Sequence, residues 1–490
     1  ATTFEGDGST MTGVAMTIAP LAYNPDVNDS IVTKATGIGI TFDHRILAGS
    51  GNITLSVATN AGVAGTVVEN FGVGSSVTIA GRKASIDPTS DLTAGETYHI
   101  SYPSGAFTNT SGDVSYVGTA YTFGVKPDFN TIWSWGGNQV GTIAGDNTTT
   151  RYSSPVQLPG FITNGAFSRA DNSLIAVNTS GELWALGALN NDGQLGLNNR
   201  TQYSSPVQIP GTTWNRVTMS RHTLATKTNG TLWSWGYGHA GALGHGDENT
   251  KSSPVQIPGT TWATGAGQFM SGNYSSAAIK TDGTLWTFGT NNYGQLGQNN
   301  KTEYSSPKQV PGTTWAKIGG CDQRSRISIK TNGEMYAWGR NTFGQLGINN
   351  DTHKSSPTQV PGTTWAYAVG GQAHAIATRT DGTLWSWGYN GKGQLGLNGS
   401  TGVYISSPTQ IGSGTDWDTG GDALWCGHNS SAALKTDGSL WSWGYNNKGQ
   451  LGLNSVERYS SPIQIPGTWN ALAAHNAKSS NYGLSAAKLG

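Results

Sequence analysis

The chain has 490 residues, and its 28 basic and 28 acidic residues give a formal net charge of zero. This balance argues against a protein that binds a nucleic-acid backbone, because such proteins need a basic surface. Glycine is abundant, at 71 residues, but 18 tryptophans and 18 tyrosines exclude a disordered chain and are typical of many short strands separated by turns. No apolar run is long enough to predict a membrane-spanning helix.

The N-terminal part divides into a polar arm and a strand-rich region. Residues 1–19 lack the basic and apolar segments of a signal peptide, and the first residue, an alanine, indicates that an initiator methionine or a leader was removed. Residues 20–126 contain no tryptophan, and runs such as "GIGITF", "NITLSV", "SSVTIA" and "TYHISY" alternate as half-buried strands do. They predict a β-sandwich. The string "NPDVND" at 24–29 predicts a turn, with a metal site as the weaker alternative.

Two strings in this region, "ITFDHRILAGSGNITL" and "IDPTSDLTAGETYHISY", resemble the bacterial Ig-like domain found in S-layer and other surface proteins. The resemblance implies an Ig-like β-sandwich over residues 20–126. Tryptophan first occurs after "GVKPDFN", and this shift in composition places the domain boundary at residue 126.

The remaining residues, 127–490, repeat a unit of about fifty residues. The tripeptide Ser-Ser-Pro ends at Pro155, Pro206, Pro254, Pro307, Pro357, Pro408 and Pro462. An apolar-aromatic-x-aromatic-Gly stretch also occurs seven times, for example "LWSWG" from Leu384, and only Leu186 departs from its aromatic pattern. Recurrence at a fixed period predicts a repeat architecture.

Each repeat is predicted to hold four short antiparallel strands, as in "WAYAV", "AIATRT", "LWSWG" and a "PTQV"-like edge. Asp-Gly or Asn-Gly before "LWSWG" is typical of a tight hairpin. Such units are the blades of a β-propeller. The first "IWSWG" lacks preceding strands, and residues 468–488 supply strands without a following "LWSWG". We therefore predict an all-β chain whose seven-bladed propeller is closed by pairing its N-terminal strand with C-terminal strands; an open solenoid is the alternative.

The motifs "TDGTLWSWGYN", "GQLGLN" and "SSPTQV" resemble those of the regulator of chromosome condensation repeat family, and they recur throughout residues 130–490. The resemblance implies a seven-bladed propeller, in agreement with the repeat count.

Most repeated residues are expected to be structural. Seventeen of the 18 tryptophans lie in two repeated motifs, the "LWSWG" stretch and the strand after "PG", and should form the core between blades, with a photochemical role as the alternative. The glutamine of "GQLG" should bond backbone groups within its loop. Cys321 and Cys426 share one repeat position and are expected to be small buried residues, neither a disulfide nor a nucleophile. No Ser-His-Asp, paired-carboxylate or metal-ligand spacing is present, so we expect no enzyme activity, metal or cofactor.

Residues that fail to repeat are the candidates for binding. Between the innermost strand and the next, each unit differs, and these segments should gather around the axis on one face. The candidate axial binding face comprises Arg169, Asp171, Arg221, His222, Tyr274, Asp322, Arg324, Gln372, His374, Trp425 and His428. Trp425 is the one tryptophan outside the repeat positions and is the strongest single candidate. The outer loops, such as "NNKTEY" and "NNDTHK", form a second variable set and are expected to be solvated.

We predict a non-enzymatic binding or assembly protein. The Ig-like resemblance suits a bacterial or phage surface, and the low charge favours a phage virion component, either tail-associated or capsid-decorating. Its location would be the virion surface, or alternatively the extracellular space or the bacterial cell surface. Partners would be other virion or cell-envelope proteins and a host surface glycan or protein, without nucleic acid or membrane insertion.

Four alternatives follow from these resemblances: an adhesin, a protein-binding regulator such as an exchange factor for a small GTPase, an inhibitor of β-lactamases, and a lyase or hydrolase.

Overall fold

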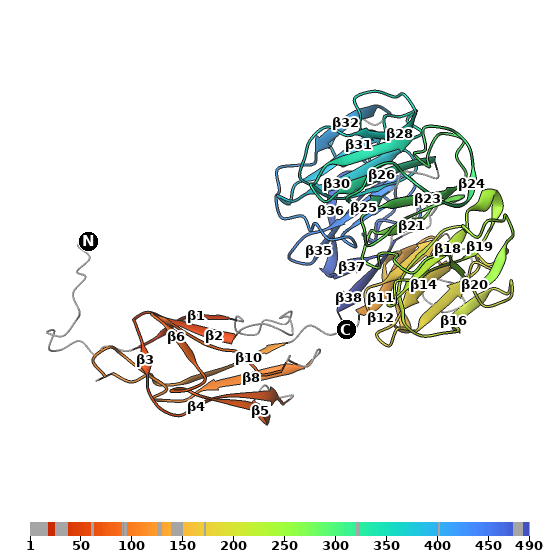
Figure 1. The fold of residues 1–490 in the computed structure, drawn as a ribbon. Coiled ribbons are helices and arrows are strands. Elements are labelled where there is room, and N and C mark those ends of the chain that lie inside the picture. Colours follow the sequence, from red (N-terminus) through yellow and green to blue (C-terminus); the bar gives the residue numbers. More distant parts are fainter. Residues whose placement is uncertain are drawn as a thin grey trace. The chain divides into compact units, whose positions relative to one another are not determined.

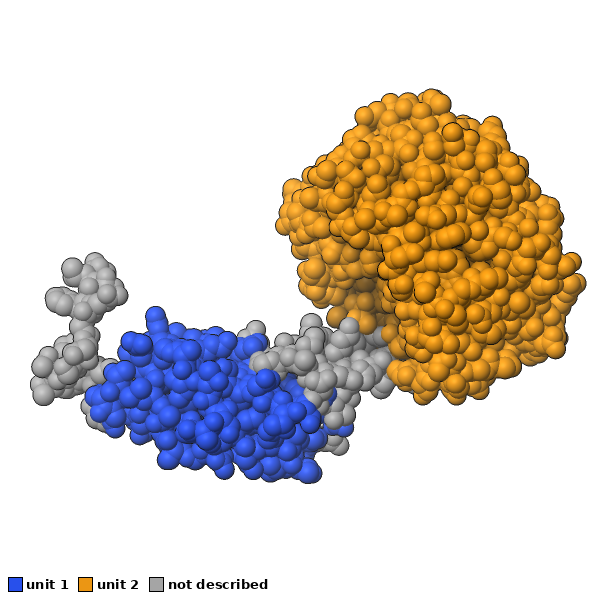
Figure 2. Space-filling view, in the orientation of Figure 1, with its two compact units in different colours: residues 1–128 blue, residues 129–490 orange. Residues whose placement is uncertain are grey.

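A computed structural model describes residues 18–24, 38–59, 63–90, 92, 96–112, 114–124, 130–138, 150–170, 173–319, 324–399, 402–473 and 484–489. The chain divides into two compact units, residues 1–128 and 129–490 (Figure 2). Residues 1–17 of the expected N-terminal arm lie outside the described residues. The expected domain boundary at residue 126 lies outside them too. Most of the predicted turn at 24–29 lies outside them as well.

The first unit is a sandwich of two antiparallel sheets, as predicted (Figure 1). One sheet has the order β1 (Pro20–Asn24), β2 (Ile38–Phe42), β7 (Lys83–Ile86) and β6 (Thr78–Ala80). The other has the order β10 (Thr119–Gly124), β8 (Thr97–Tyr102), β4 (Asn52–Ala58) and β5 (Ala64–Gly72), and β3 (Leu47–Ala48) pairs with β9 (Phe107–Thr108). In β8, Tyr98, Ile100 and Tyr102 are buried while the intervening residues are more exposed, so the predicted alternation is confirmed.

The second unit contains seven four-stranded antiparallel sheets within the described residues. Six of the sheets consist of four consecutive strands each. The first three are β13 (Phe167–Ala170), β14 (Ser173–Val177), β15 (Leu183–Gly187), β16 (Tyr203–Ile209); β17 (Trp214–Met219), β18 (His222–Lys227), β19 (Leu232–Gly236), β20 (Lys251–Ile257); and β21 (Phe269–Ser271), β22 (Ser275–Ile279), β23 (Leu285–Gly289), β24 (Tyr304–Gln309). The next three are β25 (Trp315–Gly319), β26 (Ser325–Lys330), β27 (Met335–Gly339), β28 (Lys354–Gln359); β29 (Trp365–Gly370), β30 (His374–Arg379), β31 (Leu384–Tyr389), β32 (Tyr404–Gln410); and β33 (Leu424–Cys426), β34 (Ser430–Leu434), β35 (Ser439–Gly444), β36 (Tyr459–Thr468). The seventh sheet combines β37 (Ala471–Leu472) and β38 (Ser485–Leu489) with β11 (Asn130–Gly136) and β12 (Tyr152–Thr163).

The second unit also contains the three-residue 3₁₀ turn η1 (His239–Gly241), and no helix among the described residues is long and apolar enough to cross a membrane. The first strands of successive sheets contact one another, for example β21 with β25 and β25 with β29, so they lie innermost in each blade.

The repeated tryptophans form the interfaces between blades, as predicted. Trp387 is fully buried, and its indole Nε1 donates to the backbone carbonyl of Gln345 in the preceding blade at 2.9 Å. Trp365 contacts both Trp385 and Trp387, with ring centroids 5.9 and 6.1 Å apart. The second glycine of "GQLG" makes room for this ring, because a Cβ at Gly347 would lie 2.8 Å from Trp387 Nε1.

The two other repeated motifs meet across the same interfaces. A Cβ at Gly344, the first glycine of "GQLG", would lie 2.7 Å from the Cα of Ser406 in the next blade's Ser-Ser-Pro. Asn349, in the left-handed conformation at φ 60°, donates its backbone N–H to the Ser406 carbonyl at 2.8 Å. The glutamine of the loop is buried and bonds backbone groups, as predicted: Gln345 Oε1 accepts from the Phe343 N–H at 2.9 Å.

The first strand of the repeat region pairs with the last strand of the chain. β11 is antiparallel to β38, from Asn130 opposite Leu489 to Ser134 opposite Ser485. Trp135 Nε1 donates to the carbonyl of Gln450 at 3.1 Å, which is the contact made at the other interfaces. The sheet β12-β11-β38-β37 is therefore assembled from both ends of the repeat region, as the missing strands of the first repeat predicted.

Candidate functional site

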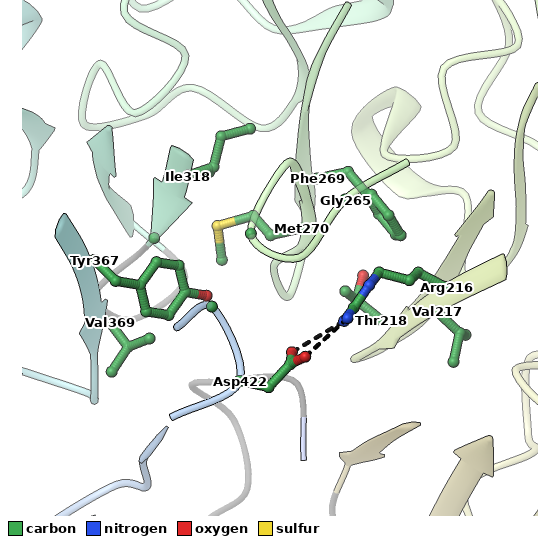
Figure 3. Close-up of a pocket in the computed structure, with 13 residues that line it drawn as sticks. Arg216, Val217, Thr218, Gly265, Phe269, Met270, Ile318, Tyr367, Val369 and Asp422 are labelled. Atoms are coloured by element: carbon green, nitrogen blue, oxygen red, sulfur yellow. Dashed lines mark hydrogen bonds and ion pairs between the residues drawn. The ribbon is translucent and has the colours of Figure 1, made fainter. Parts of the chain in front are cut away.

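The centre of the propeller is crossed by an ion pair (Figure 3). Arg216 on β17 and Asp422, which precedes β33, form a two-pronged contact, with Nη1–Oδ1 and Nη2–Oδ2 distances of 3.0 and 2.8 Å. The two residues belong to sheets that are not neighbours in chain order, so the contact spans the central opening. Planar, two-pronged pairing is the strongest form of an arginine–carboxylate contact.

Little space is left around this pair. The cavity beside it has a volume of about 30 Å³ and is lined by Met270, Ile318 and Tyr367 among others. Burial and the charge of Asp422 raise the pKa of Tyr367, so its hydroxyl stays protonated. A cavity of this size holds about one water molecule. The cavity at this end of the axis therefore offers little room for a ligand.

An open cleft of about 620 Å³ lies at the other end of the inner strands. Arg216 is near the start of β17, whereas the cleft gathers the turns that follow the inner strands and the segments that follow the third strands of two sheets. Tyr274 and Arg324 come from the turns, and Tyr237 and Tyr293 come from the segments after β19 and β23. We call this feature the tyrosine–arginine cleft.

Guanidinium groups lie over the tyrosine rings that line the cleft. The Arg221 guanidinium carbon lies 5.0 Å from the ring centre of Tyr274 and 5.8 Å from that of Tyr237. The Arg324 guanidinium carbon lies 5.1 Å from the ring centre of Tyr293, and that of Arg340 lies 5.7 Å from the same ring. Such contacts hold the guanidinium group over the face of the ring and do not use the N–H groups at the edge of its plane.

Further rings extend this surface. The rings of Tyr237 and His239 stack with centroids 5.8 Å apart, and Tyr274 meets Tyr237 edge-on at 5.8 Å. The outer-loop residues His353 and Glu303 also reach the site: His353 lies 5.5 Å from Tyr293, and Glu303 lines the cleft. The second variable set thus contributes to the same feature.

Three of the residues predicted for the axial binding face lie at the tyrosine–arginine cleft: Arg221, Tyr274 and Arg324. Gln372 is exposed and His428 is half-buried, and they occupy the corresponding turns after β29 and β33. Asp171 and Asp322 lie outside the described residues.

The expectation that His222 and His374 face a partner is wrong, because both are fully buried between blades. His222 Nε2 lies 2.6 Å from Ser276 Oγ in the next blade, and that hydroxyl donates to the Ala242 carbonyl. A hydroxyl has one proton, so Nε2 is the donor to Ser276. Burial, with the charge of Arg326 as the second cause, lowers the pKa of His222 to about 3. His374 repeats the contact at 2.9 Å from Ser431 Oγ.

Arg169 and Trp425 are also buried, at 5% and 4% exposure, so neither offers a contact surface. Arg169 Nη1 donates to the carbonyls of Trp135 and Leu484 at 3.2 and 3.1 Å, where β11 and β38 meet. Trp425 belongs to a buried cluster with Trp469, Leu472 and Leu484. Its unique position in the sequence reflects the atypical core beside the last sheet, and the prediction of a ligand contact at Trp425 is wrong.

Sequence reasoning missed the residues that follow the third strands, chiefly Tyr237, Tyr293, Arg340 and Phe343. They lie between the repeated "WG" and "GQLG", a stretch that was assigned to the framework. A signal was present, because these positions read "YGHA", "TNNY", "RNTF", "YNGK" and "YNNK" in successive copies. Variation between two invariant motifs marks an exposed loop held by a fixed scaffold.

The described residues contain no cluster suited to a metal ion. No group of three or more His, Cys, Asp or Glu side chains gathers there in a way that could hold a metal ion. Cys426 is fully buried, as predicted, and burial raises the pKa of its thiol well above the usual range. Cys321 lies outside the described residues.

Comparison with protein families matches both units. A model of the RCC1-like domain covers residues 113–423, and one of the regulator of chromosome condensation (RCC1) repeat covers 437–471. A bacterial Ig-like domain model covers residues 15–130. Both resemblances predicted from the motifs are confirmed.

Individual relatives are distant. The chain is 28% identical to the ultraviolet-B receptor UVR8 of Arabidopsis thaliana over 36% of this chain and 41% of the receptor. It is 28% identical to the X-linked retinitis pigmentosa GTPase regulator of Canis lupus familiaris over 38% of this chain and 18% of that protein. The matches thus span less than half of each relative. The solved structure of Prp20p from Saccharomyces cerevisiae covers 73% of this chain and 90% of its own, with a TM-score of 0.60 and 16% identity, which shows the shared fold.

Proposed function

The chain belongs to the RCC1-like domain family, and from this premise we propose that its propeller binds a protein partner at the tyrosine–arginine cleft. The observation that carries the proposal is the concentration of tyrosine and arginine in one open cleft, on the face where the repeats differ. These two residue types, with tryptophan, dominate the energetic centres of protein interfaces, because they bury large areas and still form directed hydrogen bonds.

The relatives support a protein partner. Prp20p was studied for its binding to Gsp1p and histones, and another relative is by name a GTPase regulator. Those partners belong to those proteins, and we carry over only the general property of binding a protein. The expectation that this chain is not an enzyme stays a prediction.

The proposal follows the protein-binding alternative and replaces the virion assignment as the main interpretation. The comparisons give no support to a phage particle, so that assignment, like the location at a virion or bacterial surface, stays a prediction. The Ig-like unit suits an anchoring role, in which the propeller presents the cleft to the partner.

Site-specific photo-crosslinking tests the proposal. With p-benzoylphenylalanine in place of Tyr293 in the full chain, we expect a discrete protein adduct in extracts of the organism that makes it. The same probe at Val456, which is 59% exposed on an outer loop, is the control. The adduct should disappear when Arg324→Ala is added. Equal adduct patterns at the two positions, or none, would contradict binding at the cleft.

A further inference from the structure

We infer that the tyrosine–arginine cleft takes an acidic segment of its partner, in which Asp or Glu carboxylates meet Arg221 and Arg324. The inference rests on the proposed function and adds the chemistry of the bound segment. It starts from charge: among the described lining residues Arg324 and Glu303 balance one another, and Arg221 and Arg340, which contact the lining tyrosines, add two positive charges in a chain whose net charge is zero.

The tyrosines fix how these cations are presented. Arg221 and Arg324 lie over the rings of Tyr274 and Tyr293, which are both contributed by the sheet β21–β24, so one blade supports cations from the blades on either side. A guanidinium group held over a ring face can still offer N–H groups at its edge to an anion, and Arg221 would do so through its Nη groups because its Nε is buried. Those edges match the two oxygens of a carboxylate.

The ordering of the cations before binding also favours this role. An arginine that is already held over a ring loses less side-chain entropy when an anion binds than a mobile surface lysine does. Arg340 contacts both Tyr293 and Phe343, at 5.7 and 6.0 Å, so the arrangement continues into the next loop. The aromatic edges between the cations suit an acidic segment that also carries apolar or aromatic residues.

Fluorescence anisotropy of a labelled acidic peptide with the full chain tests the inference. The probe is a peptide of alternating Glu and Tyr, and its Gln-for-Glu and Lys-for-Glu versions are comparators. We expect binding to the acidic peptide alone, weakening as salt is raised. Arg324→Gln and Arg221→Gln should each weaken binding roughly tenfold, because each removes a charge-assisted contact. Arg324→Lys should also weaken it, because an ammonium group lacks the planar fork.

Two further variants separate the cleft from general electrostatics and from misfolding. Arg458→Gln makes the same charge change at an exposed outer-loop arginine and should leave affinity unchanged. Glu303→Gln removes an exposed carboxylate of the lining and should strengthen binding, which no unfolded variant would do.

The outcomes distinguish the inference from the proposed function. Equal binding of the Gln peptide, or equal losses with Arg458→Gln, would overturn the acidic segment. A phosphoserine peptide that binds where the Glu peptide does not would replace carboxylate by phosphate and likewise overturn it. A discrete adduct that still forms when excess acidic peptide is present during irradiation would leave protein binding intact and reject only its acidic chemistry. The absence of both adduct and peptide binding would reject the two together.

Discussion

At the scale of single residues, variation between repeats has two causes that the structure separates. Arg221, Tyr274 and Arg324 vary in an open cleft, whereas His222 varies in a sealed interface. Where one blade has His222, the next supplies the small Ser276 to receive it. Where one blade has Ser275, the next supplies Arg326, whose Nη2 donates to the Ser275 carbonyl at 2.9 Å. Such compensation keeps each interface filled and hydrogen-bonded.

The buried His222 predicts a pH-dependent stability. Its pKa is lowered to about 3 in the folded chain, against 6.5 in the unfolded chain. Between these values the unfolded state binds the proton and the folded state does not, so stability is complete above about pH 6.5 and falls as pH decreases. Relative to His222→Gln, the wild type should lose about 1.4 kcal/mol more per pH unit over this window.

Urea unfolding at a series of pH values measures this difference. At pH 8, where neither state carries the proton, the two proteins should differ by a constant amount that reports packing alone. Identical pH dependence of the two proteins between pH 6 and pH 4 would show that His222 takes up its proton in the folded state.

At the scale of the element, the repeated motifs are explained by what they meet in the next blade. "GQLG" is rich in glycine because one glycine abuts the Ser-Ser-Pro backbone and the other abuts a tryptophan ring. Neither motif can change alone, since a larger residue on one side meets a fixed surface on the other. The motifs therefore recur at a fixed period because the same interface recurs between each pair of neighbouring blades.

Gly347→Ala should destabilise the propeller more than Gly412→Ala. Both glycines have positive φ, at 71° and 61°, so both variants carry left-handed strain of about 1–2 kcal/mol. A Cβ at Gly347 would lie 2.8 Å from Trp387, whereas one at Gly412 meets nothing within 4 Å. The extra cost at Gly347 should be roughly 1–3 kcal/mol of unfolding free energy. Equal losses of unfolding free energy for the two variants in denaturant titrations would mean that the interface at Trp387 accommodates the added methyl group without strain.

At the scale of the whole molecule, the propeller depends on strands that are far apart in sequence. β11 pairs with β38 on its inner side, and Arg169 and Trp135 both donate to the Leu484 carbonyl at the same junction. Both ends of the repeat region are therefore needed before the last sheet exists. Pairing across such a separation closes a long loop at a substantial entropic cost, which the interfaces on both sides offset.

A chain ending at residue 483 should keep a folded Ig-like unit and a weakened propeller. Calorimetry should show the transition of the first unit unchanged, while the propeller transition falls by roughly 10 °C or more, since the pairing of β38 with both β11 and β37 is lost. Ser485→Ala in the full chain is the matched control, because it keeps the strand. A propeller transition at the original temperature in the shortened chain would show that β38 is dispensable.

The sequence by itself determined the all-β class, the two regions, the repeat and the structural roles of tryptophan and glutamine. These follow from periodicity, and periodic residues face the same surroundings in every copy. It also pointed to the face that carries Arg221, Tyr274 and Arg324. Only the tertiary structure separated these from His222, Arg169 and Trp425, and added Tyr237 and Tyr293 from a different loop. A residue that breaks the repeat in sequence can be buried by a complementary change in the next blade, and whether it is depends on contacts across an interface that no single repeat contains.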